Sequence, residues 1–295
     1  MTRQLVLIHG RSQENKNATE LKAEWVAALK TGLAKNGLTL PLSDADIRFP
    51  YYGQTLFDHV KGKPASQVAQ VIVRGDDNNR NEAEFIRAVL LEIQAKNGIT
   101  DAQVQELANT AITERGVLNW EWVQSVMKAL DTHIPGASST SVSLATRDVY
   151  LYLRNPGFQS VIDNGVRAAF TPGVETVVVG HSLGSVVSYS LLRRDGKALG
   201  WKVPLFVTVG APLAVKVIKD ALAPIKHPEC AVKWFNAMDE RDVVALYPLD
   251  SAHFPVNPSI ENKKNVDNPT ENRHGISGYL SDAVVAKRIY DALTQ

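Results

Sequence analysis

Short apolar strands that alternate with helices constrain the fold of this chain more than any other feature of its sequence. Strand patterns occur at 5–8, 46–50, 176–179, 204–209 and 232–235. Helical patterns occur at 21–33, 161–170, 183–194, 213–222 and 279–293. The uninterrupted apolar run Leu5–Ile8 is typical of a strand that is covered on both faces. The alternation therefore predicts an α/β fold with a mostly parallel central sheet and helices on both faces.

One segment, 76–140, differs from the rest of the chain in charge and pattern. Residues 76–135 contain five basic and ten acidic residues, a local charge of −5, whereas the whole chain has a charge of +1. Three helical patterns lie in this segment, and a serine-rich run, 138–143, closes it. We expect a single domain, 1–295, with a helical insertion at 76–140 that forms a lid or cap. The alternative is a plain run of packing helices within the domain.

The composition excludes several classes of protein. A net charge of +1 is not that of a protein with a strong basic footprint, so we expect no nucleic-acid partner. No apolar run approaches the ~20 residues that span a bilayer, and no signal peptide is recognised. We therefore expect a cytoplasmic protein without a stable membrane anchor. The lone cysteine, Cys230, excludes an internal disulfide and a multi-cysteine metal site, and no metal is expected.

A Gly-x-Ser-x-Gly pattern at 180–184 lies between a predicted strand and a predicted helix. A serine on such a tight turn has strained backbone geometry, and a Cβ at either glycine would clash where the helix crosses the strand. The turn also directs the Ser182 hydroxyl toward the positive end of the helix. Ser182 is therefore the candidate nucleophile, and the alternative is a glycine-rich turn with an incidental serine. His181 is expected to pack nearby rather than to act as a base.

A serine hydroxyl needs a histidine to take its proton and an acid to orient that histidine. On a strand–turn–helix of this kind the chain order is serine, acid, histidine. The candidate acids follow the strand at 232–235, and so lie at the carboxyl end of the predicted sheet. We choose Asp242, which directly precedes two valines, and Asp239 is the alternative.

The candidate base must then follow Asp242 in the chain. His227 precedes the acid, which breaks the order. His274 lies in a polar loop directly before the last predicted helix, where a loop can place a histidine over the nucleophile. We choose His274. The alternative is His253, which lies in a proline-rich stretch only eleven residues after Asp242.

Stabilisation of an oxyanion requires two N–H donors near the nucleophile. One is expected to be the backbone N–H of Leu183, the residue after Ser182, and the other comes from the loop after an early strand. Gly10 would let that loop approach closely, so the Arg11 N–H is the candidate and the Ser12 N–H is second. The alternative is that His9-Gly10 merely ends a strand.

Together these residues resemble the α/β-hydrolase superfamily, in particular its lipase-like and esterase-like members with a Gly-His-Ser-Leu-Gly elbow. The matching parts are 5–10, 177–184, 208–213 and the pair Asp242 and His274. The resemblance covers 1–55 and 158–295. Two features depart from it: Arg11 and Ser12 replace a glycine-rich oxyanion loop, and the helical insertion precedes the elbow.

The resemblance implies a serine hydrolase that needs no cofactor and works through an acyl-enzyme. We expect it to cleave carboxylic esters of small molecules with the triad Ser182, His274 and Asp242, while the insertion roofs the pocket and sets the acyl size. An acyltransferase with the same triad is a second hypothesis. A non-catalytic module that binds a ligand or a protein through the insertion is a third.

Overall fold

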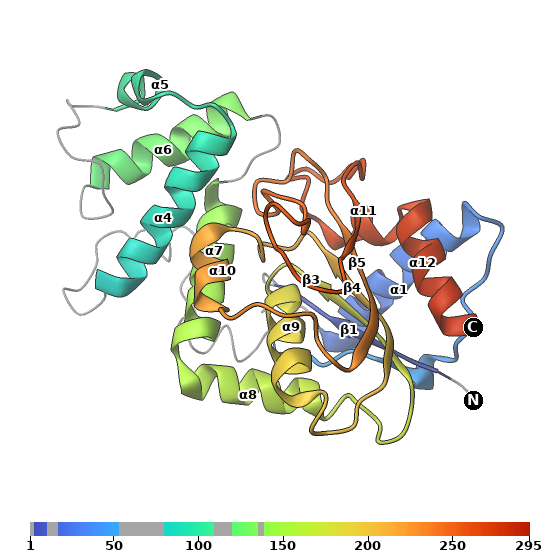
Figure 1. Ribbon diagram of the computed structural model, residues 1–295. Helices are drawn as coiled ribbons and strands as arrows, with labels where there is room; N and C mark the ends of the chain where they lie inside the picture. Colours follow the sequence, from blue (N-terminus) through green and yellow to red (C-terminus); the bar gives the residue numbers. More distant parts are fainter. Residues whose placement is uncertain (1–2, 11–16, 53–79, 109–119, 135–138) are drawn as a thin grey trace.

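The sheet of this protein is parallel throughout. A computed structural model describes residues 3–10, 17–52, 80–108, 120–134 and 139–295 (Figure 1). Its six strands have the order β2-β1-β3-β4-β5-β6, and every neighbouring pair is parallel. The strands are β1 (Gln4–Ile8), β2 (Ile47–Arg48), β3 (Thr176–His181), β4 (Val203–Val209), β5 (Ala231–Ala237) and β6 (Glu261–Lys263). This arrangement confirms the predicted α/β fold class.

Helices cover both faces of the sheet. They are α1 (Ala18–Ala34), α4 (Arg80–Lys96), α5 (Asp101–Glu106), α6 (Trp120–His133), α7 (Ser139–Arg154), α8 (Pro156–Arg167), α9 (Leu183–Asp195), α10 (Lys216–Ala221), α11 (Ile276–Leu280) and α12 (Ala283–Thr294). A short 3-10 helix, η1 (Asp44–Asp46), precedes β2. Helices α1, α11 and α12 pack on one face, whereas α9 and the helices around it pack on the other (Figure 1).

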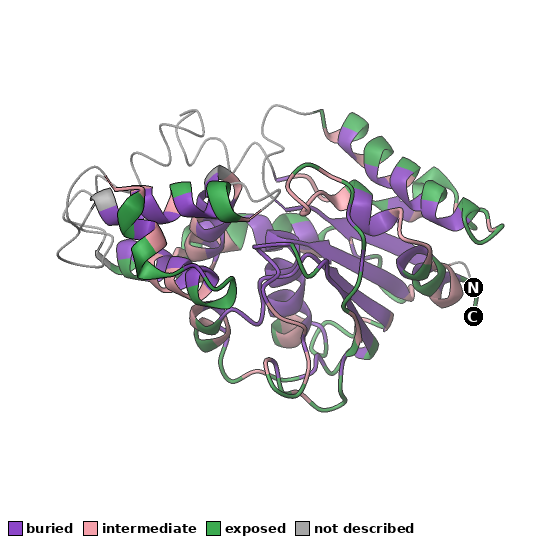
Figure 2. Cartoon of the chain, turned by 90° about the horizontal axis from the view of Figure 1, so that it is seen from above, coloured by how far each residue is buried: buried purple, intermediate pink, exposed green. Residues whose placement is uncertain are grey.

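The alternation of side chains along β1 explains why both faces are covered. Val6 and Ile8 belong to the core beneath α9, and Leu5 and Leu7 belong to the core beneath α1 and α12. All four side chains are completely buried, as expected where successive residues point to opposite faces of a sheet. In Figure 2 the strands are purple, whereas the outer surfaces of the helices carry the exposed residues.

The helical patterns within 76–140 correspond to α4, α5 and α6, and α6 ends at His133. Part of the serine-rich run lies in helix α7, which was not predicted and which begins at Ser139 and continues to Arg154. Asp131 explains this start, because its carboxylate accepts hydrogen bonds from both the N–H and the hydroxyl of Ser139, each 2.8 Å long. Val142, Leu144, Ala145, Val149 and Tyr152 are buried along α7. Residues 76–79, 109–119 and 135–138 lie outside the described residues.

The end of the chain also differs in detail from the prediction. The closing helix expected at 279–293 is two helices, α11 and α12. Asp282 separates them, because its side chain accepts the N–H groups of Val284 and Val285 and so caps α12. This division gives the residues just before α12 their own short helix, which lies against the functional residues described below. Among the described residues, no helix has both the length and the apolar character needed to cross a bilayer.

Candidate active site

The carboxyl ends of four adjacent strands meet at one edge of the sheet, because parallel strands all run in the same direction. Gly10 lies just beyond β1, Ser182 just beyond β3, Gly210 just beyond β4 and Asp242 a few residues beyond β5. In open α/β sheets this edge is where ligands bind. Three of the sequence-predicted regions therefore share one location, even though they are far apart in the chain.

Ser182 occupies a strained turn between β3 and α9. Its φ is 54° and its ψ is −123°, a conformation that costs about 1–3 kcal/mol for a residue with a side chain. The flanking glycines allow close packing. A Cβ on Gly180 would lie 2.7 Å from the carbonyl oxygen of Gly184, and one on Gly184 would lie 2.1 Å from that of Ile8. The sequence therefore folds here into the tight strand–turn–helix that its glycines predict.

One of the two expected backbone donors lies next to the serine. Leu183 is the first residue of α9, so its N–H has no acceptor within its own helix. Gly10 lies directly against the nucleophile candidate, since a Cβ there would be 2.8 Å from the Cβ of Ser182. The loop after β1 thus reaches Ser182, as the sequence predicts for a second donor. Arg11 and Ser12, the candidates for that donor, lie outside the described residues.

Asp242 and His274 form a largely buried hydrogen-bonded pair. Nδ1 of His274 lies 2.7 Å from Oδ2 of Asp242, and the two side chains are 11% and 0% exposed. The other carboxylate oxygen, Oδ1, accepts the N–H groups of Val244 at 2.9 Å and Ala245 at 3.4 Å. Asp242 is thus held by the loop that follows it, and it presents its second oxygen to the histidine.

This pairing determines which nitrogen of His274 is free to accept a proton. A carboxylate only accepts hydrogen bonds, so Nδ1 carries the hydrogen and the lone pair lies on Nε2 in the neutral ring. Nε2 is buried and has no hydrogen-bond partner within the described part of the chain, Ser182 included. Hydrogen bonds between a base and its nucleophile are often long before substrate binds. The arrangement leaves an available proton acceptor close to the serine turn.

His181 connects the serine turn to the histidine loop. Its Nε2–H donates to the backbone oxygen of His274 at 2.8 Å, and the two rings have centroids 4.8 Å apart. Burial, together with the nearby His274 ring, holds the pKa of His181 well below its ordinary value, so this ring stays neutral. His181 therefore positions the neighbouring loop, in agreement with its expected packing role.

The alternative acid has other partners. Asp239 accepts two side-chain hydrogen bonds from Arg241, at 2.9 and 2.8 Å, and one from the backbone N–H of Asn268, at 2.9 Å. Burial opposes ionisation of Asp239, but the bonds from Arg241 and Asn268 outweigh it and hold the pKa below its ordinary value. Asp239 therefore anchors the loop that leads to His274.

The alternative histidines are also engaged elsewhere. Nδ1 of His253 lies 2.7 Å from Asp250, and the His253 ring is stacked on Tyr247. His227 precedes β5, so it lies at the amino end of the strands, opposite the serine turn. The structure therefore brings His274, and neither of these histidines, to Asp242.

His9 stabilises the loop after β1. Its Nδ1–H donates to the Gly10 oxygen at 2.6 Å, and its Nε2 accepts the Tyr52 N–H at 3.1 Å. Both bonds require the same neutral tautomer. Burial lowers the pKa of His9 to about 4, which keeps that tautomer in place at neutral pH. These two hydrogen bonds therefore hold in place the loop after β1, which approaches Ser182.

Two residues at the site were not predicted from sequence. The Tyr279 hydroxyl donates to Oδ2 of Asp242 at 2.6 Å. Gly210 has a φ of +56°, and a Cβ there would lie 3.0 Å from Tyr279, 3.2 Å from His274 and 3.3 Å from Asp242. The sequence offers a weak signal for Gly210, which follows a strand, but none for Tyr279, because its role depends on how α11 packs.

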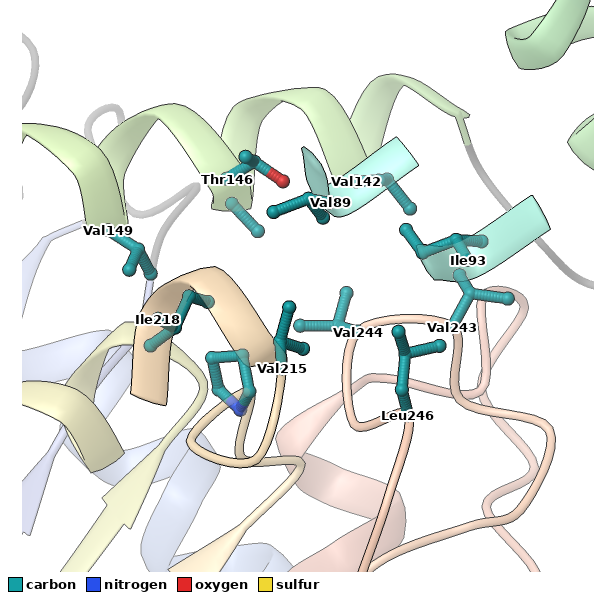
Figure 3. Close-up of a pocket in the computed structure, with 12 residues that line it drawn as sticks. Val89, Ile93, Val142, Thr146, Val149, Val215, Ile218, Val243, Val244 and Leu246 are labelled. Carbon is teal, nitrogen blue, oxygen red and sulfur yellow. The ribbon is translucent and has the colours of Figure 1, made fainter. Parts of the chain in front are cut away.

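An apolar pocket lies beside the site, between α4 and α7 on one side and the loops after β4 and β5 on the other (Figure 3). It is lined by Val89, Ile93, Val142, Ala145, Thr146, Val149, Pro212, Val215, Ile218, Val243, Val244 and Leu246. Two of these residues link it to the site, since Val243 follows Asp242 and Pro212 is two residues from Gly210. Within the described residues, no group of three or more His, Cys, Asp or Glu side chains is arranged to hold a metal ion.

The fold and the site define a class, an α/β protein with a buried acid–histidine pair beside a serine turn. Comparison of the chain with protein-family models, with curated proteins and with solved structures finds no match in any of the three. The geometry of the site is therefore the basis for any statement of function.

Proposed function

We propose that this protein is a serine hydrolase that cleaves carboxylic esters of small molecules through an acyl-enzyme. The observation that carries the proposal is the His274–Asp242 bond of 2.7 Å, with Nε2 of His274, which has no hydrogen-bond partner among the described residues, near the strained turn at Ser182. These are the three groups that activation of a serine hydroxyl requires. The resemblance of 177–184 to the elbow of α/β hydrolases supports the same assignment.

In the proposed reaction, Nε2 of His274 takes the Ser182 proton while Oγ bonds to the acyl carbon. The carbonyl electron pair moves onto oxygen, where the Leu183 N–H and the predicted Arg11 N–H stabilise the negative charge. The tetrahedral intermediate collapses, the C–O bond to the alcohol breaks, and His274 returns the proton to that alcohol. Water, activated by the same histidine, then attacks the acyl-enzyme, and the acid leaves with Ser182 restored.

The apolar pocket supports a short aliphatic acyl group as the substrate moiety. Nine of its twelve lining residues are β-branched, so their side chains are stiff and the walls do not adapt easily. Its internal volume is about 20 Å³, roughly the space of one water molecule. A small acyl group would therefore require α4 and α7 to move slightly apart, and longer chains would require a larger movement.

Covalent labelling tests the proposal. A fluorophosphonate probe should label the wild-type protein, and peptide mapping should find the adduct on Ser182. Ser182→Ala should abolish labelling. Ser190→Ala is a matched control, because Ser190 lies on the same helix and its buried hydroxyl has no hydrogen-bond partner among the described residues. Equal labelling of wild type and Ser182→Ala would refute the assignment.

A further inference from the structure

We propose that Tyr279 is a positioning residue of this site, whose hydroxyl weakens the hold of Asp242 on the His274 proton. The inference rests on the proposed function and extends it to a residue outside the triad. Without this donor, Asp242 would attract the protonated histidine more strongly. The histidine would then become an effective base only at higher pH.

The hydrogen bonds of Tyr279 have a fixed direction. The Asp239 backbone N–H donates to the tyrosine oxygen at 3.3 Å, and the tyrosine hydroxyl donates to Oδ2 of Asp242 at 2.6 Å. A backbone N–H cannot accept and a carboxylate cannot donate, so the chain of donors runs from Asp239 through Tyr279 to Asp242. Tyr279 is completely buried, so no solvent competes for these bonds.

Tyr279 and His274 share a single oxygen. Both bonds end on Oδ2 of Asp242, whereas the backbone N–H groups of Val244 and Ala245 converge on Oδ1. Within the described part of the chain, no Lys or Arg is hydrogen-bonded to Asp242. Neutral dipoles therefore surround the negative charge, and the tyrosine dipole acts on the oxygen that faces the base.

Tyr279 remains a donor over the working pH range. Burial, followed by the charge of Asp242 and the hydrogen bond to it, raises its pKa well above the ordinary value. The titratable groups around it are Asp239, Asp242 and His274, together with His181, whose ring centroid lies 6.1 Å away. Arg241 is paired with Asp239 and so balances that carboxylate.

The tyrosine is fixed relative to the histidine loop. Asn268 donates from its side chain to the Gly275 oxygen at 2.9 Å, and Gly278 packs against it so closely that a Cβ there would lie 2.0 Å from Oδ1 of Asn268. The loop with His274 and the helix with Tyr279 therefore form one unit. This unit holds both donors on Oδ2 of Asp242 at once.

The test compares Tyr279→Phe with a matched control. Tyr152→Phe is that control, because Tyr152 is also completely buried and its hydroxyl also donates to a carboxylate, Asp163, at 2.7 Å, between α7 and α8. Two quantities are measured against pH: the rate constant of fluorophosphonate labelling, and the chemical shifts of the His274 ring by NMR. Thermal denaturation verifies that each variant is folded.

We expect Tyr279→Phe to move the acid limb of the labelling profile, and the NMR midpoint with it, upward by about 0.5–1 pH unit. Tyr152→Phe should leave both in place. A merely structural role for Tyr279 would lower the labelled fraction at every pH without moving the limb. An unchanged limb and an unchanged midpoint in folded Tyr279→Phe would overturn the inference.

For a second substitution, we expect the acid limb of the labelling profile to move in the opposite direction. Site-specific 3-fluorotyrosine at position 279 keeps the ring and the hydrogen bond but is a stronger donor, so the acid limb should move downward. An upward or absent shift would contradict the inference even if Tyr279→Phe does not fold. A wild-type protein that fails to label would instead refute the proposed function, and the NMR titration would still decide how Tyr279 acts on the Asp242–His274 pair.

Discussion

The hydrogen bonds around Asp242 predict how the substitution Asp242→Asn would change the site. Asparagine keeps the shape of aspartate but replaces one oxygen with an NH2 group. Oδ1 accepts N–H groups from Val244 and Ala245, so the amide oxygen must stay on that side. The NH2 group then faces His274 and Tyr279, both of which are donors to Oδ2 in the wild type.

The opposite orientation of the asparagine amide is the less stable of the two. It would place an NH2 group against two backbone N–H groups, and each unsatisfied buried group costs about 1–3 kcal/mol. In the favoured orientation, Nδ1 of His274 must accept from the NH2 group, so its hydrogen moves to Nε2. A ring with hydrogen on Nε2 cannot take the serine proton, and the loss of rate should be about 10³–10⁴-fold.

The assay is kcat/KM for p-nitrophenyl acetate together with the labelling rate of Ser182. Asp250→Asn is the matched control, because Asp250 pairs with His253 at 2.7 Å and also accepts backbone N–H groups. It should retain nearly full activity. Retention of more than about a tenth of wild-type activity by Asp242→Asn would refute the tautomer mechanism. An equal loss in Asp250→Asn would point to His253 instead.

Two further predictions concern the pocket and the stability of the fold. Val149→Ala removes two methyl groups from the pocket wall and should raise the ratio of kcat/KM for p-nitrophenyl butyrate to that for p-nitrophenyl acetate about tenfold. Val126→Ala, on α6, should leave this ratio unchanged. An unchanged ratio in Val149→Ala would show that the pocket does not bind the acyl group. Burial of Asp195 is outweighed by its bonds to Arg194 and Arg167, so its pKa in the folded state lies below the ordinary value. The stability from this carboxylate is therefore present at neutral pH and lost as the pH falls below about 4. Asp195→Asn should lower the urea midpoint more at pH 7 than at pH 3, and an equal loss at both values would contradict this reasoning.

The parts of the fold that depend on local pattern were predictable. The apolar runs at 5–8 and 176–179 became β1 and β3, since a strand covered on both faces must be apolar throughout. β6 was not predicted, because its residues Glu-Asn-Lys have no apolar pattern and its position depends only on pairing with β5. The start of α7 was missed because its first turn is held by Asp131, a contact that the serine-rich sequence does not reveal.

Chain order narrowed the candidate site but could not complete it. Asp239 and Asp242 are three residues apart and both follow the same strand, so chain order alone does not distinguish them, and the turn between them determines which one faces His274. The contact of Tyr279 with Asp242 could not be predicted from the sequence for another reason. Its hydroxyl reaches Asp242 from α11, a short helix that Asp282 separates from α12, whereas the sequence showed a single helical pattern at 279–293.

The contact between Gly184 and the end of β1 has a consequence for how the site assembles. The backbone of α9 rests against Ile8, while the acid, the base and the tyrosine come from residues 242 to 279, so the site draws on segments from nearly the whole length of the described chain. Contacts between segments so far apart in the chain form more slowly than local contacts. On the proposed function, labelling of Ser182 should therefore require that these segments have come together, and in a mixture it should count molecules with an assembled site rather than partly folded ones.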